Sequence, residues 1–159
     1  MNLSRRAAQV QDALDQFGIS LQVMELPDST RTAEEAAAAV GCSVGQIAKS
    51  LVFKRTSSNQ PVLVIASGDH RVNLEVLSQY LEDKIEMADA DFVREATGYV
   101  IGGVPPVGHS QAIETYIDQH LFSFEHIWAA AGTPRAVFKL TPNQLKDVTQ
   151  GRVISVVGD

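Results

Sequence analysis

The chain has 159 residues, of which 45% are hydrophobic and 20% are charged, and its formal net charge is -6. A chain of this length can bury roughly 70% of its unfolded surface in one domain, so we expect a single domain over residues 1–159. Its apolar runs are too short to cross a bilayer, and its acidic balance argues against nucleic-acid binding through phosphate neutralisation alone. The N-terminus lacks the apolar block of a secretory signal, and Cys42 has no partner for an internal disulfide. A cytoplasmic protein is therefore expected.

The first part of the chain predicts helices with a strand between them. Apolar residues three or four positions apart predict a helix over residues 4–17, with Ser4 as its N-cap. Alternating residues predict a strand over residues 21–26. Thr32 and Glu35 have the spacing of a capping box, which opens an alanine-rich helix that ends at Gly41. A short helical segment follows Ser43.

The rest of the chain is richer in strands. Two apolar runs and the loop between them predict a hairpin over residues 49–55 and 62–67. Helices are expected at residues 74–81, 90–96 and from Pro142 to before Gly151. Further strands are expected at residues 84–87, 114–117, 127–130, 135–140 and 153–157. This mixture predicts one α/β domain around a mixed, strongly curved sheet.

Two segments carry most of the functional information. Lys49 begins an apolar strand, so its side chain faces either solvent or a cleft. Residues 97–109 form a loop with four glycines and two prolines, in which Gly102 and Gly103 permit backbone conformations closed to other residues. Exposed amides in such a loop can bind an anion or stabilise an oxyanion. A lysine at a strand end and a tight connecting loop remain the structural alternatives.

Conventional catalytic motifs are missing from the sequence. Ser67 and His70 lie close in sequence, but a nucleophile and its base need a hydrogen bond that sequence neighbours rarely form. There is no phosphate-binding Walker loop and no dinucleotide-binding glycine motif. The four histidines and Cys42 lack metal-ligand spacing, so no metal and no cofactor are predicted.

Taken together, these segments resemble the YbaK/ProX family, the free-standing relatives of the editing domain in bacterial prolyl-tRNA synthetases. The similarity runs from about residue 32 to the C-terminus and is most specific at residues 41–53, 66–71 and 97–108. The resemblance implies a barrel-like mixed sheet flanked by helices. It also implies hydrolysis of the ester that links a wrong amino acid to the terminal adenosine of transfer RNA. Pro105 replaces a small residue of several relatives, which bears on amino-acid selectivity.

The resemblance also implies a set of site residues. The family's lysine falls on Lys49, and its Gly-x-x-x-Pro loop falls on residues 102–106. Lys49 would engage the terminal phosphate or the ester, while amides around Gly102 and Gly103 would hold the oxyanion. Residues expected to bind substrate are Thr32, Ser67, Gly68, Asp69, Tyr99, Val104, Pro105, Pro106, His109 and Gly132. A cap, turn or packing role is the structural alternative for the weaker members of this set.

The expected partner is the acceptor end of an aminoacyl-tRNA, with prolyl-tRNA synthetase as a candidate second partner and no membrane. Alanine or cysteine on proline transfer RNA is the expected substrate. The sequence does not indicate an oligomeric state. Two alternatives stay open: a module that binds aminoacyl ends or a synthetase without hydrolysis, and a hydrolase of simple esters.

Overall fold

Strand β3 (Pro61–Ser67) is buried along its whole length and lies inside the sheet. The structure is a computed structural model and describes residues 3–157. Successive side chains of β3 point to opposite faces, so Leu63 and Ile65 pack into one hydrophobic core and Val64 and Ala66 into another. Because both faces of β3 are covered, its sequence is a continuous apolar run without polar alternation.

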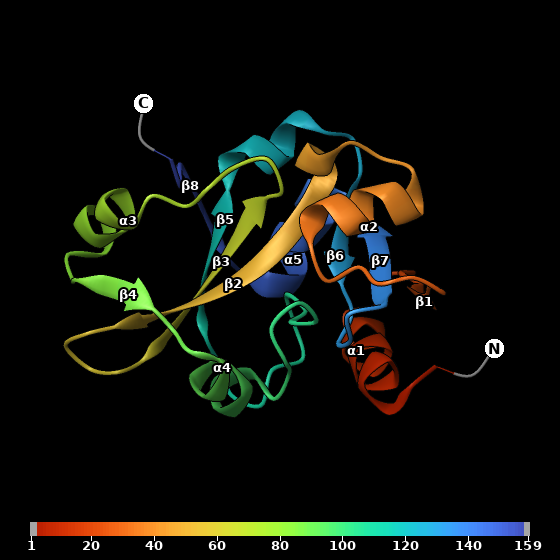
Figure 1. Cartoon of the computed structure of the whole chain (residues 1–159), viewed down its shortest axis with the longest axis horizontal. Helices are drawn as coiled ribbons and strands as arrows, with labels where there is room; N and C mark the ends of the chain where they lie inside the picture. Colours follow the sequence, from red (N-terminus) through yellow and green to blue (C-terminus); the bar gives the residue numbers. More distant parts are fainter. Residues whose placement is uncertain (1–2, 158–159) are drawn as a thin grey trace.

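The sheet has eight strands in the order β1-β7-β6-β2-β3-β5-β8, and β4 pairs with the far end of β2. The pairs β2–β6, β3–β5 and β5–β8 are parallel and the others are antiparallel, as a mixed sheet requires. Figure 1 shows the long strand β2 crossing the molecule between β3 and β6. The remaining strands are β1 (Val23–Glu25), β2 (Ile47–Arg55), β4 (Ile85–Met87), β5 (Glu114–Asp118), β6 (Ile127–Ala130), β7 (Ala136–Leu140) and β8 (Arg152–Ile154).

Helices surround this sheet, with α2 near the β6–β7 side and α3 near β4 and β8 (Figure 1). They are α1 (Arg5–Asp15), α2 (Ala33–Val40), α3 (Leu74–Leu81), α4 (Ala90–Thr97) and α5 (Pro142–Thr149), with short 3-10 helices η1 (Val44–Gln46) and η2 (Gln119–Ser123). Each α-helix begins at a residue whose side chain accepts a backbone N–H of the first turn. These caps are Ser4, Thr32, Asn73, Asp89 and Thr141.

The predicted fold class is confirmed: a single α/β domain has a mixed sheet flanked by helices. Some boundaries differ from the prediction. Phe17 was expected on the apolar face of the first helix, but α1 ends at Asp15 and Phe17 is 45% exposed. The last strand was expected at residues 153–157 and spans Arg152–Ile154, and η2 was not predicted. No helix between residues 3 and 157 combines the length and apolar character needed to span a bilayer.

Candidate active site

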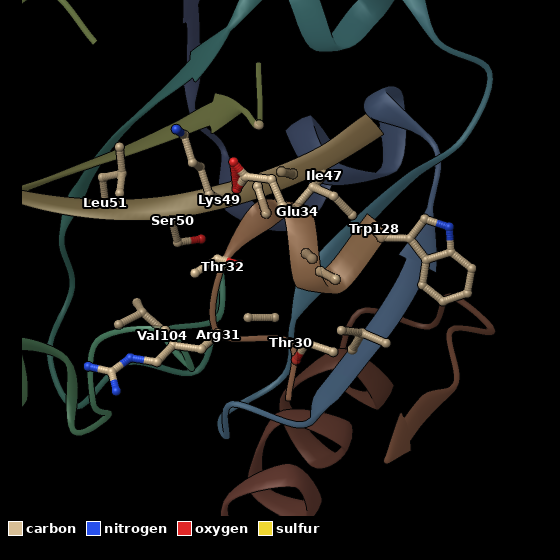
Figure 2. Close-up of a pocket in the computed structure, with 18 of the residues that line it drawn as sticks. Thr30, Arg31, Thr32, Glu34, Ile47, Lys49, Ser50, Leu51, Val104 and Trp128 are labelled. Atoms are coloured by element: carbon tan, nitrogen blue, oxygen red, sulfur yellow. The ribbon is translucent and has the colours of Figure 1, made fainter. Parts of the chain in front are cut away.

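A cavity of about 320 Å³ opens beside the first half of β2. Four segments far apart in the sequence supply most of its lining: residues 30–36, 47–51, 101–104 without Gly103, and 128–130. Figure 2 shows Lys49, Ser50 and Leu51 along β2, above Thr32 and the side chains of Arg31 and Val104. Lys49 and Gly102 therefore lie on the same cavity, as the sequence interpretation required.

Lys49 projects from a strand whose neighbours are apolar. It pairs with Ala66 of β3, is half-buried and contributes to the cavity lining. Figure 2 shows its ammonium on the opposite side of β2 from the Ser50 hydroxyl, Arg31 and Val104. Lys49 takes part in none of the ion pairs formed between residues 3 and 157. The carboxylate of Glu34 lines the same cavity, but not within ion-pair distance. The ammonium is consequently available to an anionic ligand.

The cavity also borders an unpaired stretch of the β2 backbone. The N–H of Arg55 donates to Gln60 on the β3 side, so the odd-numbered residues of β2 bond toward β3 and the even-numbered ones point to the other edge. On that edge β6 pairs with the first two residues of β2 and β4 with the last three. Ser50 lies between these two pairings and has no strand partner on this edge. The Ser50 hydroxyl is likewise buried without a hydrogen-bond partner within residues 3–157.

The glycine loop reaches the same cavity through a tight turn. The N–H of Gly103 donates to the Val100 carbonyl at 3.0 Å, and Gly102 has a φ of 91°. A type II turn requires a positive φ at this third position, which explains the glycine. A Cβ at Gly102 would lie 2.6 Å from Cγ of Arg31. No hydrogen-bond partner for the Gly102 N–H is found within residues 3–157, so this amide can serve a ligand.

Gly103 was expected to donate its N–H to an oxyanion, but the structure places it outside the cavity. Its N–H closes the turn on Val100, and the residue is buried and does not line the cavity. The N–H of Gly132 donates to its carbonyl at 2.9 Å, and a Cβ at Gly103 would lie 2.9 Å from the Thr133 backbone. Gly103 and Gly132 therefore hold the turn against the loop between β6 and β7, and Gly132 does not line the cavity either.

Tyr99 and His109 brace the same loop from behind and do not line the cavity. The Tyr99 hydroxyl donates to the Gly108 carbonyl at 3.0 Å, and burial raises the pKa of this phenol. Nε2 of His109 lies 2.7 Å from the Pro105 carbonyl, an acceptor, so this nitrogen carries the proton. Burial lowers the pKa of His109, which favours the neutral ring. Both side chains fix the loop that carries Gly102.

The other expected substrate-binding residues divide into two groups. Thr32, Gly68 and Val104 line the cavity, and Thr32 also caps α2. The remaining members lie outside the lining: Ser67, Asp69, Pro105 and Pro106. Ser67 is fully buried and its hydroxyl reaches the Gly45 carbonyl at 2.7 Å, so it is not placed as a nucleophile beside His70. The two prolines are buried within the loop.

Several lining residues were not singled out from the sequence. Arg31 lies against Gly102, Glu34 extends from the first turn of α2, and Trp128 comes from β6. An acidic residue in the first turn of a helix is explained by the helix dipole alone, so the sequence did not indicate that Glu34 lines a cavity. The buried Thr30 hydroxyl has no partner within residues 3–157. No local pattern marks these residues, because only the packing of α2 and the glycine loop on β2 brings them together.

Known proteins share this architecture. The sequence profile of the aminoacyl-tRNA editing domain matches residues 27–148. A solved structure described as a "putative trans-editing enzyme for prolyl tRNA synthetase" is 44% identical with a TM-score of 0.93, covering 99% of this chain and 100% of that chain. The fold and cavity thus place the chain among α/β editing domains. The chain belongs to the aminoacyl-tRNA editing domain family, which confirms the resemblance found in the sequence.

Two curated relatives extend this comparison. The "Putative Cys-tRNA(Pro)/Cys-tRNA(Cys) deacylase EbsC" of Enterococcus faecalis is 26% identical over 79% of this chain and 76% of its own length. The proline–tRNA ligase of Bacillus licheniformis is 39% identical over 62% of this chain, but the match spans only 17% of that longer protein. The chain is therefore similar both to a free-standing member and to one segment of a synthetase.

Proposed function

We propose that this chain hydrolyses the ester bond between a small amino acid, alanine or cysteine, and the terminal adenosine of proline transfer RNA. The observation that carries the proposal is the shared cavity of Lys49 and Gly102, in a chain of the aminoacyl-tRNA editing domain family. The Lys49 residue and the Gly102 amide line one cavity, and no conventional nucleophile of the serine–histidine or cysteine–histidine kind lines it with them within residues 3–157. This arrangement suits a substrate that is already activated.

The proposed reaction needs positioning and charge stabilisation more than covalent catalysis. A water oxygen forms a bond to the ester carbonyl carbon, and the bond between that carbon and the ribose oxygen then breaks. The Gly102 N–H donates to the carbonyl oxygen as it becomes negative, and Lys49 holds the terminal phosphate or the ester. The neighbouring ribose hydroxyl orients the water. The products are the free amino acid and uncharged transfer RNA.

The lining of the cavity supports a small amino-acid side chain. Its buried members are short or aliphatic: Thr30, Ala36, Ile47, Ala48, Val104, Ala129 and Val137. Burial of a methyl or thiol group against such a wall is favourable, whereas a larger side chain must displace packed residues. One methylene is worth about 1–3 kcal/mol in such a pocket, so size selection here is graded.

The mouth of the cavity supports contact with the acceptor end. Arg31 is exposed beside Gly102, and with Lys49 it supplies two cationic groups for phosphates. The chain as a whole has a net charge of -6, which opposes wide contact with the RNA body. We therefore propose that recognition is confined to the acceptor end or is assisted by prolyl-tRNA synthetase. Binding should show a shallow dependence on salt concentration.

The test is deacylation of a panel of mischarged transfer RNAs by the wild type and by Lys49→Met. Removing one group that stabilises an oxyanion costs about 10²–10³ in rate, and we expect a loss of that size for Lys49→Met. Lys54→Met is the matched control, because Lys54 lies on the same strand but pairs with Glu86 outside the cavity. Equal rates for the two variants would contradict the proposal.

The alternatives predict different results in the same panel. Binding of aminoacyl-tRNA without hydrolysis of any member would identify a binding module. Hydrolysis of simple amino-acid esters at rates equal to those of aminoacyl-tRNA would identify a small-molecule hydrolase.

A further inference from the structure

A cluster of histidine and aspartate side chains lies at one edge of the sheet, apart from the cavity lining. Strands β3 and β5 are parallel, so their carboxyl ends meet at the same edge. Asp69 and His70 follow β3, while Asp118 ends β5 and His120 follows it. We call these four residues the His70–His120 cluster. The two imidazole rings are stacked, with centroids 4.3 Å apart and an interplanar angle of 23°.

Asp118 orients the first histidine of the cluster. Its side chain is 1% exposed and accepts the backbone N–H of Ser67 and of His120, each at 3.0 Å. Nδ1 of His70 lies 2.8 Å from Oδ2 of this carboxylate, so Nδ1 carries a proton and donates. The lone pair of the neutral ring is then on Nε2. A buried carboxylate that holds the other ring nitrogen is the usual outer partner of a metal-binding histidine.

Three ligand atoms converge in front of this carboxylate. One atom each from Asp69, His70 and His120 lies within 4.8 Å of the other two, and Nε2 of His120 is 3.7 Å from Oδ1 of Asp69. Tetrahedral zinc with bonds of about 2.0–2.1 Å separates its ligand atoms by about 3.3 Å. The three atoms are close enough to share one ion, and the stacked rings must turn so that both lone pairs point at it.

The hydrogen bonds of the cluster leave acceptors in excess. The Ser67 hydroxyl has one proton but reaches two acceptors, the Gly45 carbonyl at 2.7 Å and Oδ1 of Asp69 at 2.8 Å. A divalent cation can take the acceptor that this one proton leaves unsatisfied.

We propose that Asp69, His70 and His120 bind a divalent transition-metal ion of the zinc type. Imidazole nitrogen and carboxylate oxygen are its preferred ligands, and two histidines with one carboxylate leave a coordination position open. The side chains of Asp69, His70 and His120 are 50%, 25% and 34% exposed, so this position faces solvent. The proposal does not depend on deacylation. Sequence spacing could not predict it, since about fifty residues separate the two histidines.

The metal would fix one wall of the cavity. Gly68 precedes Asp69 and lines the cavity, and a Cβ at Gly68 would lie 2.3 Å from the Val44 carbonyl of η1. Asp69 in turn packs against Gly45, where a Cβ would lie 2.8 Å from its carboxylate. An ion held by Asp69 therefore holds the turn after β3 against η1, next to the start of β2.

The experiment measures metal binding directly, with zinc alone as the probe. Metal-free protein in a Cys42→Ser background, which removes the one thiol, is titrated with Zn²⁺ by calorimetry, and Co²⁺ is added separately to read its visible absorption. We expect one ion per chain and a Co²⁺ spectrum of a nitrogen–oxygen site with fewer than six ligands. His120→Ala and Asp69→Asn each remove a direct ligand. Loss of a residue that only orients a ligand weakens metal binding by about 10–100-fold, so we expect each variant to weaken Zn²⁺ binding by about 100-fold.

His126→Ala is the matched control, because His126 is near in sequence and lies outside the cluster. It should bind Zn²⁺ as the parent protein does. Circular dichroism checks that each variant is folded, and the nearly isosteric Asp69→Asn decides the matter if His120→Ala does not fold. Absence of one-to-one binding by the parent, or unchanged affinity in Asp69→Asn, would overturn the proposal. A thermal stability that does not rise when Zn²⁺ is added would also overturn it.

Discussion

The replacement Gly102→Ala separates the backbone geometry of the glycine loop from its chemistry. Gly102 has a φ of 91° and its amide is available in the cavity, so an alanine there strains the turn and shifts a proposed oxyanion donor. The added Cβ also meets Cγ of Arg31 at 2.6 Å. Because that atom belongs to a long exposed side chain, we expect Arg31 to move aside and the protein to fold.

The magnitude follows from the two effects taken separately. A left-handed conformation costs a non-glycine residue about 1–2 kcal/mol, and the smaller entropy of the unfolded alanine chain returns about 0.4–1 kcal/mol. The net loss of about 1 kcal/mol lowers Tm by about 2–4 °C for a domain of this size. A shift of the amide by about 1 Å is expected to slow deacylation by about 100-fold.

Gly98→Ala provides the matched control for this experiment. Gly98 has a φ of 87°, but the nearest atom to its added Cβ is Cβ of Ser110 at 3.7 Å, outside the cavity. Both variants should lose stability in thermal unfolding, and Gly102→Ala should lose more because its Cβ also displaces Arg31. Only Gly102→Ala should lose single-turnover deacylation of mischarged transfer RNA. If the folded Gly102→Ala protein deacylates as fast as Gly98→Ala, the Gly102 amide is not the oxyanion donor.

Two further predictions concern pH. The Arg55 guanidinium donates to both carboxylate oxygens of Glu114 and lowers the pKa of that carboxyl, so its stabilisation is present above about pH 4.3 and is lost as the pH falls through the folded pKa. Glu114→Gln should cost about 1–2 kcal/mol in urea unfolding at pH 7, and a gap to wild type that stays constant down to pH 3 would contradict this. Burial lowers the pKa of His109, so the unfolded chain takes up the proton first and wild-type stability should fall as the pH drops below about 6.5. His109→Gln, which can still donate to the Pro105 carbonyl, should lose less stability between pH 7.5 and 5.5; parallel curves for the two proteins would refute the buried neutral histidine.

Much of the fold was predictable because its signals are local. Ser4, Thr32 and Asp89 cap helices that begin within a residue of their predicted starts. The long apolar runs became β2 and β3, since apolar strands covered on both faces need no alternation. Strand ends and the η2 turn were not predictable, because pairing with neighbouring strands sets where a strand stops.

For the candidate site, the sequence predicted some residues and missed the roles of others. The sequence and the family resemblance singled out Lys49 and the glycine loop, and the structure places Lys49 and Gly102 on one cavity; their roles stay predictions. The roles of Gly103 and His109 were not, because only the folded loop reveals that one closes the turn and the other holds Pro105. Hydrogen bonds inside a loop depend on conformation, and composition does not specify it.

By itself, the sequence determined the α/β class, the helix starts and two of the segments that border the cavity. Tertiary structure alone decided which residues complete that cavity, and it alone brought His70 to His120. The physical reason is that propensity, capping and turn formation act over a few residues, whereas cavities and ligand clusters form where distant strands end together. The parallel pairing of β3 with β5 is such a long-range choice.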